Sequence, residues 1–568
     1  MKQVGVDSAV IEGGAALAAL GFNVTAQPLT WEGELNIGGS PTPVLVSLPR
    51  GFPYDLPVVK VDRTKLGRQI PHVERSGKVC IASSNGLLLD ATRPASLVRE
   101  ALLRAQNILF KGLQGENAGD LQQEFSAYWA SSAGRTVLTF CDVKGNSREV
   151  AIAETAKGRG SIAFVAGESA DELRTTAERI GLRIGAVEPA WLIRLKTPVM
   201  PPPFEAETNL RYVGTLIRKH LDDASRITVE RWLTGGQTRL TFLFSFPINN
   251  SHGDAVFAWR LSSSLPSDGF RIGRVPLGIA VGRNGRKRGE RLDIQRGDAD
   301  FLEARTGSSA SYRGKRVLIV GCGAVGGYLA MCLADSGIGH LTLVDDDQLR
   351  SENAIRHVLG LAHVGRPKVE ALRTVIQSRL PHVSLDVHGT RLEEVLDKDP
   401  GLARRHDLVA LATGDHTFEL RMSESLRAES RLIHVWLEAH GIAGHVLADG
   451  HPEIGCLGCL FDADDVHGLR CKASFYEPGQ DFSAAVGGCA GTFTPFGSLD
   501  AQRAGIEAAR VTLRILAGEL KNSTLVSWFE PNAAPQSAKL ALSARARQMS
   551  PGGRTEVTQH AGCPRCAR

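Results

Sequence analysis

One stretch constrains the fold more than any other: a short apolar run that passes directly into a glycine-rich loop and then into a helix. Residues 316–320 read Arg-Val-Leu-Ile-Val, the composition of a buried strand. Residues 321–327 read Gly-Cys-Gly-Ala-Val-Gly-Gly, and residues 328–336 continue as an apolar helix. Glycines at such a turn let the backbone approach a phosphate, and the helix N-terminus presents unpaired N–H groups to it. The sequence therefore predicts an α/β domain with a nucleotide site.

Charged residues beyond this loop favour a nucleoside triphosphate over a dinucleotide. The predicted strand 340–344 ends at Asp345, and an acid about 20 residues beyond the glycines can bind a ribose hydroxyl. Arg356 and Lys368 supply two cations, which suit the charge of a triphosphate. A later predicted strand, from residue 407, leads to Asp415, which is well placed to hold Mg²⁺. A nicotinamide dehydrogenase would explain the glycines but not Arg356, Lys368 and Asp415.

Taken in order, these elements resemble the ThiF-type adenylating superfamily, which includes the ubiquitin-activating enzymes. The resemblance runs from about Ser311 to the C-terminus. It implies that the carboxylate at the end of a partner protein attacks the α-phosphate of ATP, giving an acyl-adenylate and pyrophosphate. It also implies a homodimer. The ATP-binding residues that the resemblance implies are Gly321, Gly323, Gly326, Gly327, Asp345, Asp347, Asn353, Arg356, Lys368 and Asp415, with Asp415 also binding the metal.

The N-terminal part has a different order of elements. We expect a helix at 9–20, strands at 22–27, 30–37 and 44–48, and a long helix at 97–113. A proline-rich turn, Phe-Pro-Tyr from residue 52, and a loop that carries His72, Gly77 and Cys80 lie between the last strand and the long helix. This order resembles the ubiquitin-conjugating fold.

The conjugating-like resemblance implies that Cys80 carries a thioester and passes the acyl group to an amine. A thiolate is both a good nucleophile and a good leaving group. The His-Pro-Asn tripeptide of that fold is absent, and His72-Val73-Glu74 offers no side-chain amide to an oxyanion. A non-catalytic binding module, or a buried structural role for Cys80, is therefore an alternative interpretation.

Two Cys-x-x-Cys pairs predict a structural zinc site near the C-terminus. Cys456 and Cys459 form the first pair, and Cys563 and Cys566 form the second. Four thiolates suit tetrahedral Zn²⁺, and the ThiF superfamily has a structural zinc of this kind. Redox-active dithiols are the alternative.

A lone cysteine, Cys489, lies in a glycine-rich loop before a predicted helix at 499–517. A helix N-terminus can lower the pKa of a nearby thiol. The surrounding sequence resembles the catalytic cysteine region of autophagy-type ubiquitin-activating enzymes. This implies that Cys489 takes the acyl group from the adenylate. Cys471, between Arg470 and Lys472, is the alternative nucleophile.

Length, charge and cysteine use narrow the class of protein. A chain of 568 residues is too long for one hydrophobic core. Its net charge of +5 gives no indication of nucleic-acid binding. No membrane span is expected, since no run of eighteen apolar residues occurs. The N-terminus lacks a secretory pattern, so the ten cysteines favour thiol and metal chemistry over disulfides, and we expect a cytoplasmic protein.

The sequence as a whole predicts an α/β multidomain chain. Its predicted parts are a ubiquitin-conjugating-like α+β domain at 1–135, an α+β spacer domain at 136–309, and a Rossmann-like ThiF-type adenylation domain at 310–568. This order resembles the bacterial ubiquitin-activating/ubiquitin-conjugating-like fusions of CBASS anti-phage operons.

The resemblance to these fusions implies a modifier protein, a cGAS-like nucleotidyltransferase (CD-NTase), whose C-terminus is adenylated. The acyl group then moves from Cys489 to Cys80 and finally to an acceptor amine on a target protein. Two alternatives stay open: a sulfur-carrier-protein adenylyltransferase, and a non-enzymatic adaptor that senses ATP.

Overall fold

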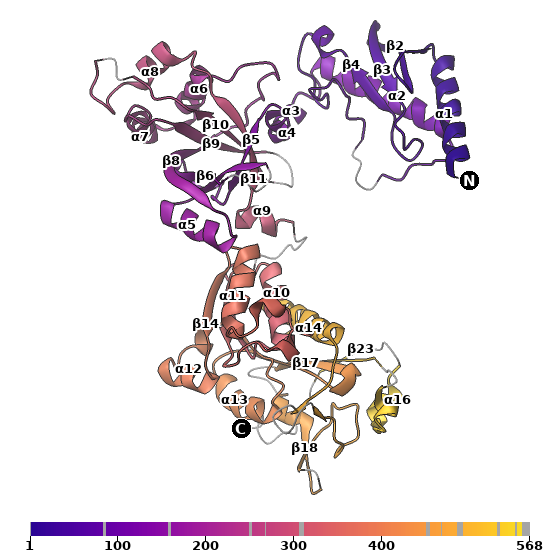
Figure 1. Cartoon of the computed structure of the whole chain (residues 1–568), viewed down its shortest axis with the longest axis vertical. Helices are drawn as coiled ribbons and strands as arrows, with labels where there is room; N and C mark the ends of the chain where they lie inside the picture. Colours follow the sequence, from indigo (N-terminus) through magenta and orange to yellow (C-terminus); the bar gives the residue numbers. More distant parts are fainter. Residues whose placement is uncertain are drawn as a thin grey trace. The chain divides into compact units, whose positions relative to one another are not determined.

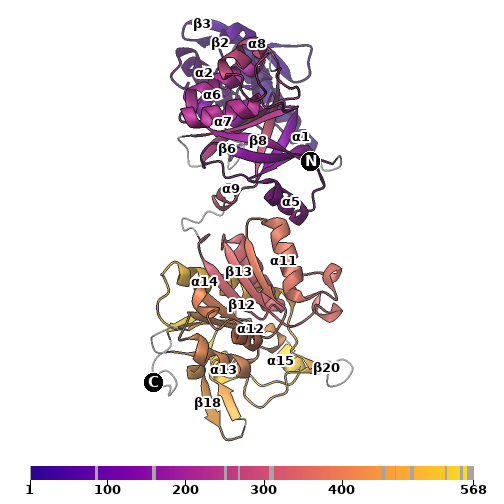
Figure 2. The same cartoon turned by 90° about the vertical axis from the view of Figure 1, so that its left-hand side faces the viewer.

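The computed structural model divides the chain into two compact units. One comprises Met1–Ala177 with Leu182–Phe301, and the other comprises Glu178–Gly181 with Leu302–Arg568. Figure 1 labels many elements of both units, and Figure 2 gives the view at right angles. The structure describes residues 2–82, 87–156, 161–248, 253–266, 269–305, 312–449, 455–466, 468–485, 492–530, 534–550 and 554–558.

The N-terminal part of the first unit is a four-stranded antiparallel sheet covered by two long helices. Strand order is β1-β2-β3-β4. Along β2 the residues Trp31, Leu35 and Ile37 are buried, whereas Glu32, Glu34 and Asn36 are exposed, the alternation of a sheet with one covered face. A two-residue turn at Gly38–Gly39, both with positive φ, joins β2 to β3. The elements are α1 (Lys2–Ala19), β1 (Asn23–Val24), β2 (Thr30–Ile37), β3 (Ser40–Ser47), β4 (Val58–Val61) and α2 (Pro94–Gln114).

The predicted elements of this part are confirmed, with shifted ends. Helix α1 begins seven residues before the expected start at residue 9, and β3 begins at Ser40, four residues before the expected start at residue 44. Strand β1 keeps only two residues, because the chain turns again before β2, where the Thr25 hydroxyl donates to the Thr30 carbonyl over 3.1 Å.

The middle of the chain folds as a closed barrel of seven strands, a closure that the sequence pattern did not predict. Strand order is β10-β11-β5-β7-β6-β8-β9. Its strands are β5 (Arg135–Thr139), β6 (Arg148–Thr155), β7 (Ile162–Gly167), β8 (Ile184–Arg194), β9 (Leu240–Pro247), β10 (Asp254–Leu261) and β11 (Glu290–Arg296). Its helices are α5 (Ala170–Arg179), α6 (Leu210–His220), α7 (Asp223–Leu233), α8 (Leu277–Asn284) and α9 (Ala299–Glu303).

Two short helices join the conjugating-like part to the barrel. They are α3 (Asp120–Gln123) and α4 (Phe125–Ala130). The buried indole of Trp129 donates to the carbonyls of Ala258 (3.1 Å) and Leu292 (3.0 Å), on two barrel strands. Phe125 packs against Phe257, with ring centroids 4.7 Å apart. Helix α4 is therefore part of the barrel's core, while the segment just before it lies beside the Cys80 loop.

The second unit is built on one eight-stranded sheet in the order β14-β13-β12-β15-β16-β17-β22-β23. The first five strands are parallel, and the last three are antiparallel. They are β14 (Ser384–His388), β13 (His340–Val344), β12 (Arg316–Val320), β15 (Leu408–Leu411), β16 (Leu432–Leu437), β17 (Ala443–Asp449), β22 (Thr524–Phe529) and β23 (Arg554–Thr558).

Helices cover both faces of this sheet (Figure 2). Helices α10 (Ala324–Asp335), α11 (Lys368–Arg379) and α14 (Ser498–Leu516) share one core with Val317 and Ile319 of β12. Helices α12 (Leu392–Lys398) and α13 (His416–Leu426) share another with Leu318 and Val320. The predicted Rossmann-like arrangement is confirmed, and its strand order reverses direction between β12 and β15. Ligands of such sheets bind at that point, beyond the carboxyl ends of the strands.

Smaller elements follow β17. They are the hairpin of β18 (Phe461–Asp464) and β19 (Gly468–Cys471), the short pair β20 (Ala484–Ala485) and β21 (Thr492–Phe493), and helices α15 (Ala534–Ser537) and α16 (Ala544–Gln548). Within the ranges that the structure describes, no helix is both long enough and apolar enough to cross a membrane.

Candidate functional site

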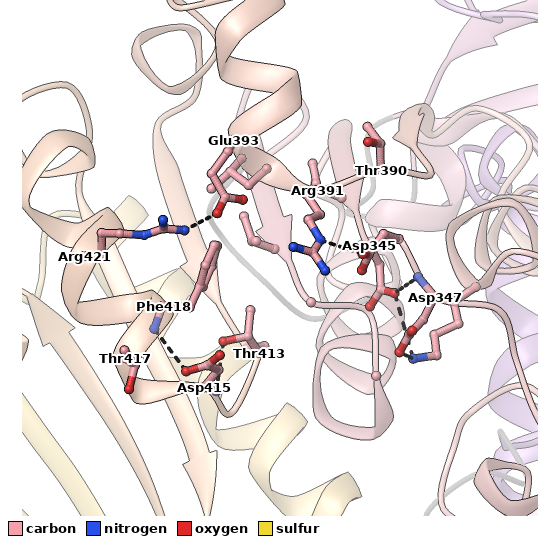
Figure 3. Close-up of a pocket in the computed structure, with 18 residues that line it drawn as sticks. Asp345, Asp347, Thr390, Arg391, Glu393, Thr413, Asp415, Thr417, Phe418 and Arg421 are labelled. Atoms are coloured by element: carbon pink, nitrogen blue, oxygen red, sulfur yellow. Dashed lines mark hydrogen bonds and ion pairs between the residues drawn. The ribbon is translucent and has the colours of Figure 1, made fainter. Parts of the chain in front are cut away.

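A cavity of about 590 Å³ lies at the carboxyl ends of the parallel strands (Figure 3). The ends of four strands supply its walls: β12 with Gly321 and Gly323, β13 with Asp345 to Asp347, β14 with Thr390 and Arg391, and β15 with Thr413 and Asp415. Lys368, at the start of α11, completes one side. Six predicted ATP-binding residues therefore line one cavity: Gly321, Gly323, Asp345, Asp347, Lys368 and Asp415.

The glycines of the loop have two different roles. Gly321 has φ of +85°, and a Cβ there would lie 2.8 Å from the Ala412 carbonyl oxygen. A Cβ on Gly326 would lie 1.8 Å from the Gly321 carbonyl oxygen, and one on Gly327 would crowd His357 at 3.2 Å. Gly321 and Gly323 line the cavity, whereas Gly326 lets α10 pack closely against the end of β12 and Gly327 leaves room for His357.

Asp345 organises the side of the cavity formed by β13. Its carboxylate accepts hydrogen bonds from the backbone N–H groups of Cys322 (2.6 Å) and Asp347 (2.8 Å). Lys368 Nζ lies 2.7 Å from Asp347 Oδ2 and 3.8 Å from Asp345 Oδ1. Burial raises the pKa of Asp345, and the Lys368 ammonium opposes that rise. The predicted ribose-binding acid and the predicted phosphate-binding lysine are thus held together.

Asp415 lies on the opposite side, at the start of α13. Its Oδ1 accepts from the Phe418 N–H at 3.0 Å, which caps the helix, and its own N–H donates to Thr413 Oγ1 at 3.2 Å. The Asp415 side chain lines the cavity (Figure 3). An oxygen ligand in this place fits the requirements of Mg²⁺.

Two arginines that the sequence did not single out also line the cavity. Arg391 Nε lies 3.2 Å from Asp346 Oδ2, and Arg421 forms an ion pair with Glu393 (Figure 3). Arg391 follows β14 directly, so the rule that residues after parallel strands meet at one edge could have identified it. Arg421 lies in the second turn of α13 and had no comparable signal.

Asn353 and Arg356 lie outside the lining of this cavity, and their roles in ATP binding stay predictions. Asn353 Oδ1 accepts from the Arg350 N–H at 3.2 Å. The Arg356 guanidinium lies over the rings of Phe493 (5.5 Å) and Phe496 (4.7 Å), just before α14.

The predicted cysteine sites are only partly described. Cys489, Cys563 and Cys566 lie outside the described residues. Cys456 and Cys459 are described, and their sulfur atoms are 3.9 Å apart. Within the described ranges, no group of three or more His, Cys, Asp or Glu residues could hold a metal ion. Burial raises the pKa of Cys471 to about 11, so this alternative nucleophile is a protonated thiol at neutral pH.

Cys80 lies at a second cavity, of about 500 Å³, in the first unit. His72, Glu74, Glu124, Tyr128 and Phe204 also line it. Cys80 is exposed, and its backbone N–H donates to the His72 carbonyl at 2.7 Å. A buried structural role is therefore excluded for Cys80.

His72 is held between two carboxylates. Its Nδ1 lies 2.8 Å from Glu124 Oε1, and its Nε2 lies 3.2 Å from Asp120 Oδ2. The hydrogen bond to Glu124 raises the pKa of His72, although partial burial opposes it. Both ring nitrogens are occupied in this arrangement, so His72 has no N–H left to stabilise an oxyanion. Partial burial raises the pKa of the Cys80 thiol, and the carboxylates of Glu124 and Glu74 raise it further.

Comparisons with known proteins match both parts of the chain. Residues 302–532 match the ThiF family, and residues 16–137 match the prokaryotic E2 family B. The predicted resemblance to ubiquitin-activating/ubiquitin-conjugating-like fusions is confirmed. The chain therefore combines a ThiF-family domain and a prokaryotic E2-family domain.

Some relatives are similar to this chain over most of its length. Two are called ATP-dependent ubiquitin transferase-like protein Cap2. The one from Pseudomonas aeruginosa is 24% identical over 487 residues, and the one from Escherichia coli is 24% identical over 521 residues; each match covers 83% of both chains. The molybdopterin-synthase adenylyltransferase of E. coli is 32% identical over 151 residues, which is 26% of this chain and 59% of that protein.

The contacts of His72 predict how the Cys80 loop responds to pH. The raised pKa of His72 means that the folded loop binds this proton more tightly than the unfolded chain does. The stability it contributes is complete below about pH 6.5, the ordinary histidine pKa, and is lost as the pH rises through the raised value. An NMR titration of the full chain should therefore give His72 a pKa above 6.5, and Glu124→Gln should lower it. A His72 pKa unchanged by Glu124→Gln would contradict this assignment.

Proposed function

We propose that this chain uses ATP and Mg²⁺ to activate the C-terminal carboxylate of a modifier protein and then conjugates it, through two cysteines, to an amine. The observation that carries the proposal is that one chain holds two separate sites of complementary chemistry. One is a cavity at the strand ends of a ThiF-family domain, and the other is an exposed cysteine in an E2-family domain.

The first cavity fits the nucleotide in the adenylation step. The backbone at Gly321 and Gly323 leaves room for phosphates, Asp345 would bind the ribose, and Lys368 would supply a cation to the phosphates. Asp415 would hold Mg²⁺, which would neutralise phosphate charge. A carboxylate oxygen of the modifier forms a bond to the α-phosphorus of ATP, the bond to the β-phosphate oxygen breaks, and pyrophosphate leaves.

The remaining steps are acyl transfers between sulfur and nitrogen. The Cys489 thiolate attacks the acyl carbon of the adenylate, and AMP leaves. The Cys80 thiolate then attacks the Cys489 thioester, and Cys489 leaves as a thiolate. Finally an amine attacks the Cys80 thioester, so that an amide C–N bond forms and the C–S bond breaks. The nitrogen loses a proton, and the Cys80 sulfur is released as a thiol.

The surroundings of Cys80 support an amine as the last acceptor. Glu74 and Glu124 supply negative charge beside the cysteine, which attracts an ammonium group. Tyr128 and Phe204, whose ring centroids are 5.3 Å apart, supply an apolar wall for the methylenes of a lysine side chain. The same charge disfavours a free Cys80 thiolate, so transfer to Cys80 should become faster as the pH rises.

The identity of the partners is proposed from the likeness to the Cap2 proteins and the fusions of CBASS operons. On this basis the modifier is a CD-NTase, the acceptor is an amine on a target protein, the enzyme acts in anti-phage defence in the cytoplasm, and it works as a homodimer. No contact with nucleic acid or membrane is needed for this cycle.

A structural zinc site is also proposed, with Cys456, Cys459, Cys563 and Cys566 as ligands. Its support is the 3.9 Å separation of the first two sulfurs, since tetrahedral Zn–S bonds of about 2.3 Å place two sulfurs about 3.8 Å apart. Zinc analysis of the purified chain should find about one ion per chain, and Cys456→Ser should lower that content. A chain without zinc, or full retention of the ion by Cys456→Ser, would contradict the site.

Two other functions are distinguished by their products. A sulfur-carrier adenylyltransferase is favoured by the likeness to molybdopterin-synthase adenylyltransferase, and it would leave a thiocarboxylate on the modifier. The match of residues 16–137 to an E2 family argues against it. An ATP-sensing adaptor is favoured by the occupied nitrogens of His72, and it would form no covalent adduct.

Non-reducing gels of the chain with Mg-ATP and a candidate CD-NTase test the proposed cycle. The wild-type chain should form an adduct that a thiol reagent removes. Cys489→Ala should abolish this adduct, because the acyl group would have no first acceptor. Cys80→Ala should retain it, because transfer would stop at Cys489.

The control is Cys141→Ala, a buried cysteine of the barrel, which should leave the adduct unchanged. An adduct that survives in both Cys489→Ala and Cys80→Ala would show that the two cysteines are assigned wrongly.

A further inference from the structure

A buried carboxylate beneath the nucleotide cavity has no part in the steps above. Glu419 lies on α13, one turn beyond Asp415, and is 1% exposed. It does not line the cavity. Burial of a charged group is costly unless hydrogen bonds and partner charges compensate it, so its contacts should reveal its role.

One oxygen of this carboxylate holds the turn at the end of β15. Glu419 Oε1 accepts from Thr413 Oγ1 at 2.8 Å and from the Thr413 N–H at 3.2 Å. Thr413 Oγ1 in turn accepts from the Asp415 N–H at 3.2 Å. Gly414, between them, has φ of +70°, which gives the turn its tight form. The chain of hydrogen bonds thus runs from Glu419 through Thr413 to Asp415, and the last two residues face the cavity.

The second oxygen is fixed from the neighbouring strand. Glu419 Oε2 lies 2.9 Å from Nδ1 of His434, a fully buried residue of β16. His434 Nε2 faces Asp449 Oδ2 at 3.9 Å, and Asp449 pairs with Arg427 at 2.8 Å. Because His434 and Asp449 belong to strands of the sheet, Glu419 has little freedom to turn away from Thr413.

We propose that Glu419, oriented by His434, is a positioning residue for Mg²⁺-dependent nucleotide binding. It fixes the Thr413–Asp415 turn so that the Asp415 carboxylate faces the cavity. The inference rests on the proposed nucleotide site. It adds a residue that touches neither nucleotide nor metal but sets the geometry of one that does.

The test is equilibrium binding of ATP to the full chain by calorimetry, with Mg²⁺ and with EDTA. Glu419→Ala removes the acceptor of two Thr413 hydrogen bonds, so the Kd for Mg-ATP should rise about tenfold. In EDTA, where Asp415 has no ion to hold, the Kd should change by less than about threefold. Glu419→Gln retains an oxygen for Thr413 and should bind Mg-ATP within about threefold of wild type.

Met422→Ala is the matched control, because Met422 is a buried residue of the same helix that belongs to the apolar core with Leu426 and Leu432. It should lower the melting temperature and leave the Kd for Mg-ATP unchanged. Thr413→Val removes the hydroxyl from the same hydrogen-bond chain but leaves the buried pair of Glu419 and His434 in place. It should reproduce the Mg²⁺-dependent loss of affinity even where Glu419→Ala fails to fold.

Three results would overturn the inference. One is wild-type affinity of Glu419→Ala and Thr413→Val for Mg-ATP, and another is a loss of equal size with Mg²⁺ and with EDTA. The third is an equal loss of Mg-ATP affinity in Met422→Ala, which would mean that Glu419 only stabilises α13. Absence of ATP binding by the wild-type chain would instead overturn the nucleotide site itself, together with this inference.

Discussion

Helix α10 can begin directly against the end of β12 only because position 326 has no side chain. A Cβ there would lie 1.8 Å from the Gly321 carbonyl oxygen, a distance at which the helix would have to move away. The close approach keeps the cavity at the ends of four parallel strands and brings the first N–H groups of α10 to its edge. Asp345 and Asp415 follow the two parallel neighbours of β12, so they lie at the same edge of the sheet as the start of α10.

The two sites of the chain differ in the charges that they offer to a ligand. In the nucleotide cavity Lys368 pairs with Asp347, Arg391 pairs with Asp346, and Arg421 pairs with Glu393. An anionic ligand can take over these cations. Around Cys80 partial burial raises the pKa of the thiol, and the carboxylates of Glu124 and Glu74 raise it further. The first environment suits polyphosphate and the second suits an incoming ammonium group, which is the order of reactants in a cycle of activation followed by conjugation.

Residue patterns predicted the elements of both terminal parts because each of these elements is encoded by neighbouring residues. Examples are the apolar run before Gly321 and the alternation along β2. They also placed Lys368 and Asp415 correctly near one strand edge. Closure of the middle barrel depends on pairing between distant strands, such as β5 with β11, which no short pattern records. The pairing of His72 with Glu124 and of Glu419 with His434 likewise depends on contacts between distant residues.

The central claim is that this chain converts a carboxyl terminus into an adenylate in the cavity beside Gly321. Exchange of labelled pyrophosphate into ATP, in the presence of a candidate CD-NTase, measures that step before either cysteine is needed. The account predicts exchange by the wild-type chain and by Cys489→Ala, and a loss of at least about a hundredfold in Asp415→Ala. Exchange that persists in Asp415→Ala, or that requires Cys489, would contradict it.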